Sequence, residues 1–370
     1  MKNILYKKAL FPGKYIQGAG VLSELPALVK LFGKRGLILA SASAQRKILP
    51  ASGIDLALHS LIADPFGGEC CETELSRLAA VISKNDIDVL VAMGGGKTID
   101  TAKIAADRAG IPVIVVPTIA STDAPCSGCA VLYSGQGVFV SVHYQKMSPA
   151  AVLVDTEIIA KAPVRFLVSG MGDALATWFE AKSCNDTRSE NECGGHATLS
   201  GLNLARLCYD TLLGYGAAAK IAVEQQVVTP ALERIVEANI LLSGIGFESG
   251  GLASAHAIHN GLTALADTHP FYHGEKVAFG TLAGLQLTDA EPEVIDTVYS
   301  FCEKIGLPTT LAEIGLAKID RTQLKLAAEK ACDPASSIHH EAGVITPKKV
   351  LHAMLAADAI GAIRKQKPCC

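Results

Sequence analysis

Short apolar, β-branched segments alternate with helical patterns over about the first 160 residues of the chain. The apolar segments are GLILAS (36–41), VLVAM (89–93), IPVIVVPT (111–118) and AAVLVDT (150–156). Strands that alternate with helices are typical of a parallel sheet with helices on its faces. Between the last two segments, two alternating stretches flank Ser134-Gly135-Gln136-Gly137, which predicts a β-hairpin beside the sheet.

After about Pro163 the apolar spacing becomes helical. One segment opens with Thr229 as N-cap and Pro230 in the first turn. The apolar residues that follow lie on one helix face: Leu232, Ile235, Val236 and Ile240. The change of pattern predicts an α/β domain at 1–162 and an all-helical domain at 163–370, with the crevice between two domains as the default site.

Composition and charge narrow the classes of function. The chain has 370 residues and is 49% hydrophobic, which is enough to bury a large core and favours two domains. It has neither an apolar run of membrane-spanning length nor a signal-peptide pattern, so we expect a cytoplasmic protein without membrane contacts. The net charge of -3 and the lack of Lys/Arg-rich runs argue against nucleic-acid binding.

The charges are unevenly distributed. Residues 1–162 carry 16 Lys and Arg against 13 Asp and Glu, whereas residues 163–370 carry 17 against 23 and eight of the ten histidines. This asymmetry favours an anion-binding first domain and a cation-binding second domain.

The eleven cysteines are scattered from Cys70 to Cys370, which predicts reduced thiols rather than a disulfide framework. Cys126 and Cys129 form a CxxC motif. This motif suits a redox pair or half of a zinc site, but no second CxxC or nearby His cluster completes either one.

The segment VLVAMGGGKTIDTAK (89–103) has the order strand, glycine turn, helix. It is not a GxxxxGK[ST] loop, because Val91 stands at the first glycine position, nor a GxGxxG motif, because Ile99 stands at the third. Its three glycines still allow a ligand to approach closely, and the N–H groups at a helix start favour an anion such as phosphate. A tight turn without a ligand is the alternative.

The predicted strands place this glycine turn at the carboxyl edge of the sheet. Met93-Gly94 and Thr118 both lie at carboxyl ends, where ligands of open parallel sheets bind. We therefore expect the glycine turn and the segment PTIASTDAP (117–125) to be neighbours around one ligand.

Residues 251–280 contain a histidine cluster with a helix-breaking Pro270. The four histidines are His256, His259, His269 and His273. A lone histidine is ordinarily structural, but this clustering suggests a metal site. The candidate carboxylate is Asp173 in SGMGDALATWFEAK, which follows two glycines at a probable helix start. Helix N-capping is the alternative for Asp173, and spacing alone favours capping without settling the choice.

Several motifs resemble the glycerol-oxidising members of the metal-dependent, iron-type alcohol dehydrogenase family, which also includes dehydroquinate synthases. They are PGKYIQGAG (12–20), MGGGKTIDTAK (93–103), PTIASTDAPCS (117–127), GMGDALATWFEAKSC (170–184), TPALERIVEAN (229–239), and FESGGLASAHAIHNGLT with HGEKVAFG. The resemblance spans nearly the whole chain. It implies a dehydroquinate synthase-like fold: an α/β nucleotide-binding domain with a parallel sheet and an all-α domain, with the active site between them.

The resemblance also implies the site residues. Zinc, one ion per subunit, would be held by Asp173, His256 and His273, with Fe2+ or Mn2+ able to replace it. Asp123 would contact the polyol, whereas His259 and His269 are not ligands in the family. The residues implied to bind NAD are Ser41, Gly94, Gly95, Gly96, Lys97, Thr98, Thr118, Ser121, Ser127, Cys129, Val131 and Tyr133.

The reaction implied is oxidation of glycerol, or a related vicinal diol, to a hydroxyketone such as dihydroxyacetone. A metal that binds the substrate hydroxyl would lower its pKa and favour hydride transfer to the nicotinamide of NAD. Asp123, Asp173, His256 and His273 are thus the expected catalytic residues. Family members form homo-oligomers, often octamers, which we also expect here.

Ser41 departs from the family pattern, which usually has an aspartate there that binds the ribose hydroxyls of adenosine. Without that carboxylate a 2′-phosphate is not repelled, and Arg46 is close in the chain. We therefore expect weaker discrimination against NADP.

Three alternatives compete with this interpretation. A dehydrogenase of a phosphorylated polyol, of the glycerol-1-phosphate type, would need cationic contacts, whereas Asp123 would repel a phosphate. A dehydroquinate-synthase-like lyase would need several basic residues near the metal, and 251–280 offers Lys276 alone. Retention of all three metal-ligand candidates argues against a catalytically silent binding protein.

Overall fold

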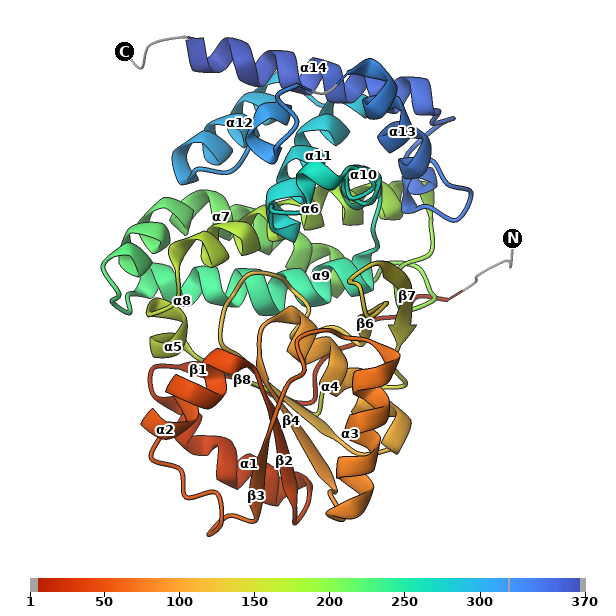
Figure 1. Ribbon diagram of the computed structural model, residues 1–370. Coiled ribbons are helices and arrows are strands. Elements are labelled where there is room, and N and C mark those ends of the chain that lie inside the picture. Colours follow the sequence, from red (N-terminus) through yellow and green to blue (C-terminus); the bar gives the residue numbers. More distant parts are fainter. Residues whose placement is uncertain (1–5, 319, 367–370) are drawn as a thin grey trace. The chain divides into compact units, whose positions relative to one another are not determined.

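The computed structural model describes residues 6–318 and 320–366, which divide into two compact units (Figure 1). The α/β unit comprises Leu10–Leu167 and Ile221–Gly244. The helical unit comprises Val168–Lys220 and the described residues before Leu10 and from Ile245 onward. This division differs from the predicted 1–162 and 163–370 at the start of the chain and at 221–244, and the boundary near 162 lies five residues later, at Leu167.

Hydrogen bonds explain the placement of the two distant segments. The N-terminal residues join the helical unit because the backbone N–H of Lys8 donates to the carbonyl of His196 at 3.1 Å. The segment 221–244 joins the sheet because Glu233 accepts hydrogen bonds from Gln17 Nε2 at 2.6 Å and from Thr156 Oγ1 at 2.7 Å. A helical apolar pattern predicts the helix but not the core on which it packs.

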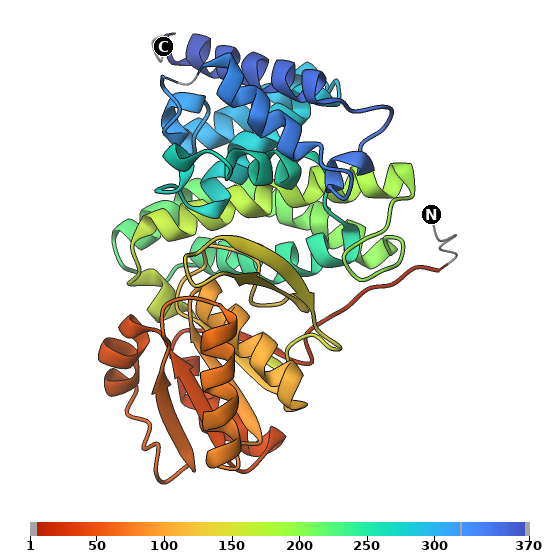
Figure 2. The same cartoon turned by 45° about the vertical axis from the view of Figure 1, so that its right-hand side comes forward.

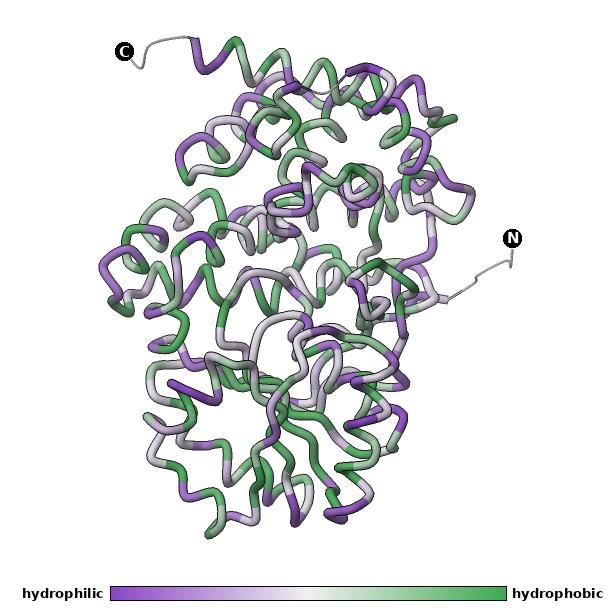
Figure 3. The backbone as a smooth tube through the Cα atoms, viewed as in Figure 1, coloured by the Kyte–Doolittle hydropathy of each residue, from purple (hydrophilic) through white to green (hydrophobic). Residues whose placement is uncertain are grey.

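A six-stranded parallel sheet forms the centre of the α/β unit, with strand order β1-β8-β5-β4-β2-β3. The strands are β1 (Tyr15–Gly18), β2 (Gly36–Ala40), β3 (Leu61–Pro65), β4 (Val89–Gly94), β5 (Val113–Pro117) and β8 (Ala151–Asp155). The four predicted apolar segments are β2, β4, β5 and β8, and all four are buried along their whole length. They are green in Figure 3, as expected for strands covered on both faces.

Helices cover this sheet. On one face α1 packs Leu25 and Leu28 against Ile38, Val91 and their neighbours. Helix α4 contacts strands β4 and β5, and α3 packs beside α4. Both helices are orange and come forward in Figure 2. The helices of this unit are α1 (Leu25–Phe32), α2 (Leu49–Ala51), α3 (Glu72–Lys84), α4 (Gly96–Ala109), α5 (Thr156–Ala160) and α8 (Pro230–Glu237). The predicted cap of α8 is confirmed, because Thr229 Oγ1 accepts from the N–H of Leu232.

The predicted hairpin is also confirmed. Strands β6 (Cys129–Tyr133) and β7 (Phe139–Tyr144) pair antiparallel. The turn between them is closed by hydrogen bonds from Ser134 to Val138 and from Gly137 to Ser134. Gly137 has a φ of 77°, a left-handed conformation that favours glycine.

Helices dominate the remainder of the described chain, as predicted. They are α6 (Val164–Thr187), α7 (Leu199–Glu224), α9 (Ser243–Gly250), α10 (Ser254–Leu262), α11 (His273–Leu287), α12 (Pro292–Ile305), α13 (Arg321–Ala331) and α14 (Pro347–Gln366). Within the helical unit α10 contacts α11 and α13, and α11 contacts α14. None of the described helices combines the length and the apolar character that crossing a membrane would require. The described cysteines, from Cys70 to Cys332, are free thiols, as expected.

Candidate active site

Asp173, His256 and His273 come together in the helical unit from α6, α10 and α11. The Oδ1 atom of Asp173 lies 3.0 Å from His273 Nε2 and 3.4 Å from His256 Nε2. The potential ligand atoms of the three residues all lie within 4.8 Å of one another. Two imidazole nitrogens and one carboxylate oxygen are a set that binds divalent transition metals and leaves coordination positions open. The three side chains therefore fit a metal ion.

The members of this group differ in exposure. The side chain of Asp173 is 1% exposed, whereas that of His273 is 37% exposed. Asp173 is therefore closed off from solvent, and His273 is the more exposed of these two potential ligands.

The position of Asp173 corrects one sequence interpretation. Helix α6 begins at Val164, so Asp173 lies in its third turn and does not cap its start. Two glycines explain why this helix approaches α11 so closely. A Cβ on Gly172 would lie 2.4 Å from the carbonyl oxygen of Gly274, and one on Gly274 would lie 1.8 Å from that of Ser169. Only glycine fits at such a contact, which places His273 beside Asp173.

The start of α11 is fixed by local hydrogen bonds. Helix α10 ends at Leu262, so the helical interruption expected around Pro270 is present. The N–H of Tyr272 donates to Glu275 Oε2 at 2.8 Å, one half of a reciprocal capping arrangement. The first residue of α11 is then His273, whose orientation follows from that of the helix end.

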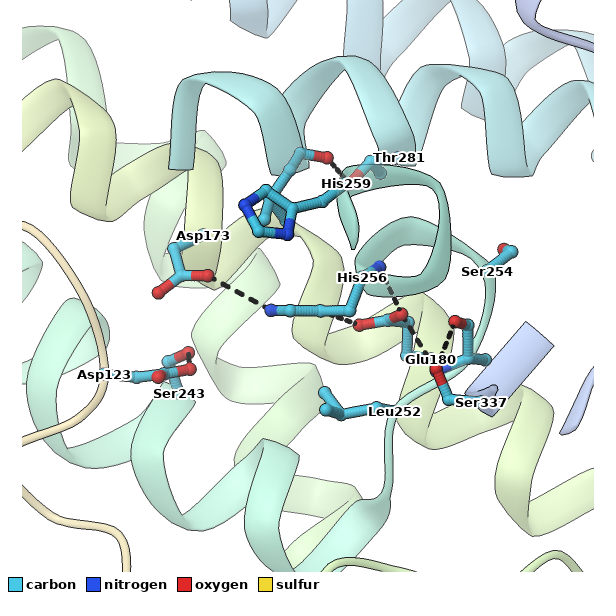
Figure 4. A network of polar contacts seen from close by, with 12 residues as sticks. Asp123, Asp173, Glu180, Ser243, Leu252, Ser254, His256, His259, Thr281 and Ser337 are labelled. Carbon is cyan, nitrogen blue, oxygen red and sulfur yellow. Dashed lines mark hydrogen bonds and ion pairs between the residues drawn. The ribbon is translucent and has the colours of Figure 1, made fainter. Parts of the chain in front are cut away.

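Glu180 is a residue of this group that sequence reasoning missed. Its Oε2 lies 2.6 Å from His256 Nδ1, and its Oε1 accepts from the N–H groups of Ala253 and His256 at 2.9 Å each (Figure 4). A carboxylate on one ring nitrogen fixes the orientation and tautomer of a histidine whose other nitrogen binds metal. Glu180 follows Asp173 by seven residues on one helix, a two-turn spacing that places both on the same face.

The other two histidines of the cluster differ from each other. His259 Nε2 lies 3.0 Å from His273 Nδ1, and its own Nδ1 lies 3.0 Å from Asn260 Oδ1. His259 therefore supports the ring of His273, whereas His269 Nε2 contacts the backbone carbonyl of Thr263.

The neighbouring histidines favour the ionised form of Asp173. Burial would raise the pKa of Asp173, but His273 and His256 hold it well below its ordinary value. Burial, reinforced by His273 and Lys276, lowers the pKa of His259 well below its ordinary value. The group thus combines a carboxylate anion with a neutral supporting imidazole.

In the α/β unit, the glycine turn lies among three strand ends. Strand β4 ends at Gly94, and α4 begins at Gly96. The N–H of Thr118 donates to the carbonyl of Gly94 at 3.0 Å, and a Cβ on Gly94 would lie 3.0 Å from Ser41 Cβ. The predicted neighbourhood of the glycine turn and the segment after β5 is confirmed, and Ser41 lies beside them.

Lys97 has a partner that the sequence did not indicate. Its Nζ lies 2.6 Å from Glu69 Oε2 and 5.3 Å from the centre of the Tyr133 ring. Lys97 and Tyr133, two of the expected cofactor residues, are therefore neighbours. Glu69 competes with any phosphate for the ammonium group of Lys97.

The remaining expected cofactor residues lie on the irregular segment after β5 and on β6. Ser127 is buried and Ser121 is half-buried. Cys129 Sγ lies 3.6 Å from Ser127 Oγ, and the N–H of Val131 donates to Asp100 Oδ2 at 3.1 Å. Among the described residues, neither a disulfide nor a metal-ligand group includes the CxxC pair.

Asp123 lies on the same irregular segment and is buried. Its Oδ2 accepts a hydrogen bond from Ser243 Oγ at 2.8 Å (Figure 4). Nearby, Asn239 Nδ2 donates to the carbonyl of Ala120 at 3.0 Å. The segment 238–243 of the α/β unit therefore fixes the backbone and the carboxylate of this part of the chain.

We compared the chain with known protein families, curated proteins and solved structures. Residues 12–156 match the family described as iron-containing alcohol dehydrogenase. A glycerol dehydrogenase from Thermotoga maritima is 52% identical over 360 residues, covering 96% of this chain and 98% of its own length. One from Pseudomonas putida is 48% identical over 357 residues, covering 95% and 96%. The crystal structure of a probable glycerol dehydrogenase from Sinorhizobium meliloti 1021 has a TM-score of 0.92 and 44% identity, and the match covers 97% of this chain and 100% of that one.

Proposed function

The chain belongs to the iron-containing alcohol dehydrogenase family, among its glycerol dehydrogenases, and we propose that it oxidises glycerol to dihydroxyacetone with hydride transfer to NAD. Related vicinal diols are further substrates in this proposal. The observation that carries it is the convergence of Asp173, His256 and His273 within 4.8 Å in a chain so similar to glycerol dehydrogenases.

Asp173, His256 and His273 would hold one zinc ion per subunit, and Fe2+ or Mn2+ suits the same ligands. The bound metal would lower the pKa of a substrate hydroxyl. Glu180, by accepting at His256 Nδ1, keeps Nε2 of that ring available as a ligand. His259 orients His273 in the corresponding way.

The turn Gly94 to Thr98 would receive the pyrophosphate of NAD. The absence of side chains at its glycines and the start of α4, a helix of 14 residues, support an anion there. Ser41 would face the adenosine ribose, since it lies beside Gly94 at the end of the neighbouring strand. NAD supplies the acceptor of the hydride. The residues proposed to line the rest of the cofactor are Thr118, Ser121, Ser127, Cys129, Val131 and Tyr133.

Asp123 would accept hydrogen bonds from the polyol hydroxyls. A buried carboxylate suits a neutral polyol and repels a phosphate, which supports glycerol over a phosphorylated polyol. The lyase alternative is weakened by Lys276, the basic side chain of the 251–280 segment, which is buried and donates toward the carbonyl of Thr268.

The proposal also covers the cellular location and the oligomeric state of the enzyme. We place it in the cytoplasm as a homo-oligomer. The hairpin exposes apolar side chains at Val138, Phe139 and Val140, which supports an assembly because a subunit contact could bury them.

A substrate panel with metal analysis tests the function. The purified protein, loaded in turn with Zn2+, Fe2+ and Mn2+, is assayed for NADH formation from glycerol, propane-1,2-diol, glycerol 1-phosphate and ethanol. Glycerol and the free diol should be oxidised with the highest kcat/KM. Turnover of the phosphorylated polyol alone, or no NADH from any polyol with the metal bound, would refute the proposal.

A further inference from the structure

Lys103 is a fully buried lysine on α4, with a side chain that is 0% exposed. Its Nζ donates to the carbonyl of Ala124 at 2.9 Å, to Ser127 Oγ at 3.2 Å and to the carbonyl of Cys129 at 2.5 Å. An ammonium group has three N–H donors and no acceptor. These three acceptors therefore satisfy it completely.

Packing alone does not explain a lysine at this position. Ile99 and Ala106, one turn before and one turn after Lys103, are apolar and buried, so an apolar side chain would continue the surface that they form. A buried ammonium group is costly to remove from water unless it is hydrogen-bonded. A lysine is satisfied here only when all three acceptors surround its ammonium group. The lysine therefore favours one conformation of the segment that carries these acceptors.

The segment held in this way is the irregular chain between β5 and β6. It carries Asp123 immediately before the Ala124 carbonyl, and Ser127 is itself one of the acceptors. Ser127 Oγ also lies 3.3 Å from the Ala124 carbonyl and 3.4 Å from that of Cys129. The three acceptors thus form one compact cluster around Nζ, directly beside the proposed polyol contact.

Two other side chains of α4 form hydrogen bonds with the hairpin and the residues after it. Asp100, one turn earlier, accepts from the N–H of Val131 at 3.1 Å. Asp107, one turn later, accepts from the N–H of Lys146 at 3.0 Å and contacts His143 Nε2 at 2.9 Å. Figure 1 shows β6 and β7 near α4. The helix that begins at the glycine turn therefore also holds the segment of the other proposed cofactor residues.

We propose that Lys103 is a positioning residue of the polyol and cofactor sites. Its ammonium group fixes residues 124–129 and thereby sets the places of Asp123 and Ser127. This inference rests on the proposed function, because those two residues are assigned to polyol and NAD through it.

The test compares Lys103→Met, which keeps the length of the side chain and removes its donors, with Lys146→Met. Lys146 lies at the end of the same hairpin and is exposed, so its variant should behave like the parent protein. In Lys103→Met, kcat/KM for both glycerol and NAD should fall about 100-fold, as misplacement of groups that bind the reactants does. Metal content should stay at the parental level, because Asp173, His256 and His273 belong to the other unit.

Hydrogen exchange measured by mass spectrometry separates local release of this segment from a general loss of stability. Amides of 118–133 should exchange faster in Lys103→Met, while amides of α1 and of α11 keep their parental rates. Lys103→Gln, which retains two donors, should lie between the two proteins in both assays and serves as the variant if Lys103→Met does not fold. Parental kcat/KM in the folded variant, or a loss of activity with unchanged exchange at 118–133, would overturn the proposal.

Failure of the proposed function is distinguishable from failure of this inference. If the parent protein makes no NADH from glycerol, the function is wrong. The exchange rates at 118–133 then decide on their own whether Lys103 fixes the segment.

Discussion

The carboxylate of Glu180 lies 2.6 Å from Nδ1 of His256, while Nε2 of the same ring faces Asp173 at 3.4 Å. The two ring nitrogens of His256 thus face two different acids. The buried Glu180 also binds the N–H groups at the start of α10. One carboxylate therefore sets both the position of the helix and the orientation of the imidazole.

Glu180→Gln should weaken metal binding about 10- to 100-fold. The amide keeps an oxygen for the backbone N–H groups, but it can place an N–H donor opposite Nδ1, which favours the tautomer with a proton on Nε2. Equilibrium dialysis against a metal buffer measures the affinity. Asp186→Asn, an exposed carboxylate on the same helix, is the control. Equal affinity in Glu180→Gln and the parent would show that Glu180 does not orient His256.

Gly274→Ala should destroy the metal group while Gly214→Ala leaves it intact. The added Cβ at 274 would meet the Ser169 carbonyl at 1.8 Å, so α11 must move and carry His273 away from Asp173. At Gly214, within α7, a Cβ meets nothing within 4 Å, and alanine should stabilise the helix by up to about 1 kcal/mol. Metal content and thermal unfolding of both variants check the pair. A metal-loaded, fully active Gly274→Ala would contradict the close-contact argument.

Part of this arrangement could be predicted from the sequence, because it depends on local pattern. Apolar runs predict β2, β4, β5 and β8, and Thr229-Pro230 predicts the start of α8. The position of Asp173 in the third turn of α6 could not be predicted from the glycines before it. Of those glycines, Gly172 serves a contact with α11, which is a tertiary feature.

The residues that sequence reasoning missed share one property. Glu180 and Lys103 act through partners 76 and 21 to 26 residues away. The importance of a buried acid or lysine depends on which acceptors and donors the fold brings to it, and helical spacing reveals only that Glu180 shares a face with Asp173. For the same reason the helix 230–237 was predicted but its packing on the sheet was not.

Ser41→Asp should raise the preference for NAD over NADP at least about tenfold, since a carboxylate beside a 2′-phosphate costs more than about 1.4 kcal/mol. The ratio of kcat/KM for the two cofactors measures it. Ser41→Asn, which adds a similar volume without charge, is the control. An identical ratio in Ser41→Asp and the parent would remove Ser41 from the adenosine end of the site.

Glu69→Gln should lower KM for NAD about two- to threefold. The partly exposed pair between Glu69 and Lys97 is worth about 1 kcal/mol, and its loss frees the ammonium group for the pyrophosphate. Lys97→Met should have the opposite effect on KM. If both variants keep the parental KM, Lys97 does not contact the cofactor.

The most direct measurement of the central claim is the metal content of the parent protein and of Asp173→Asn, together with NADH formation from glycerol. Asp210→Asn, an exposed carboxylate on α7, is the matched control, and circular dichroism verifies the fold of each. The account predicts about one metal ion per chain and glycerol oxidation in the parent and in Asp210→Asn, with both lost in a folded Asp173→Asn. A folded Asp173→Asn that retains its metal and full activity would contradict it.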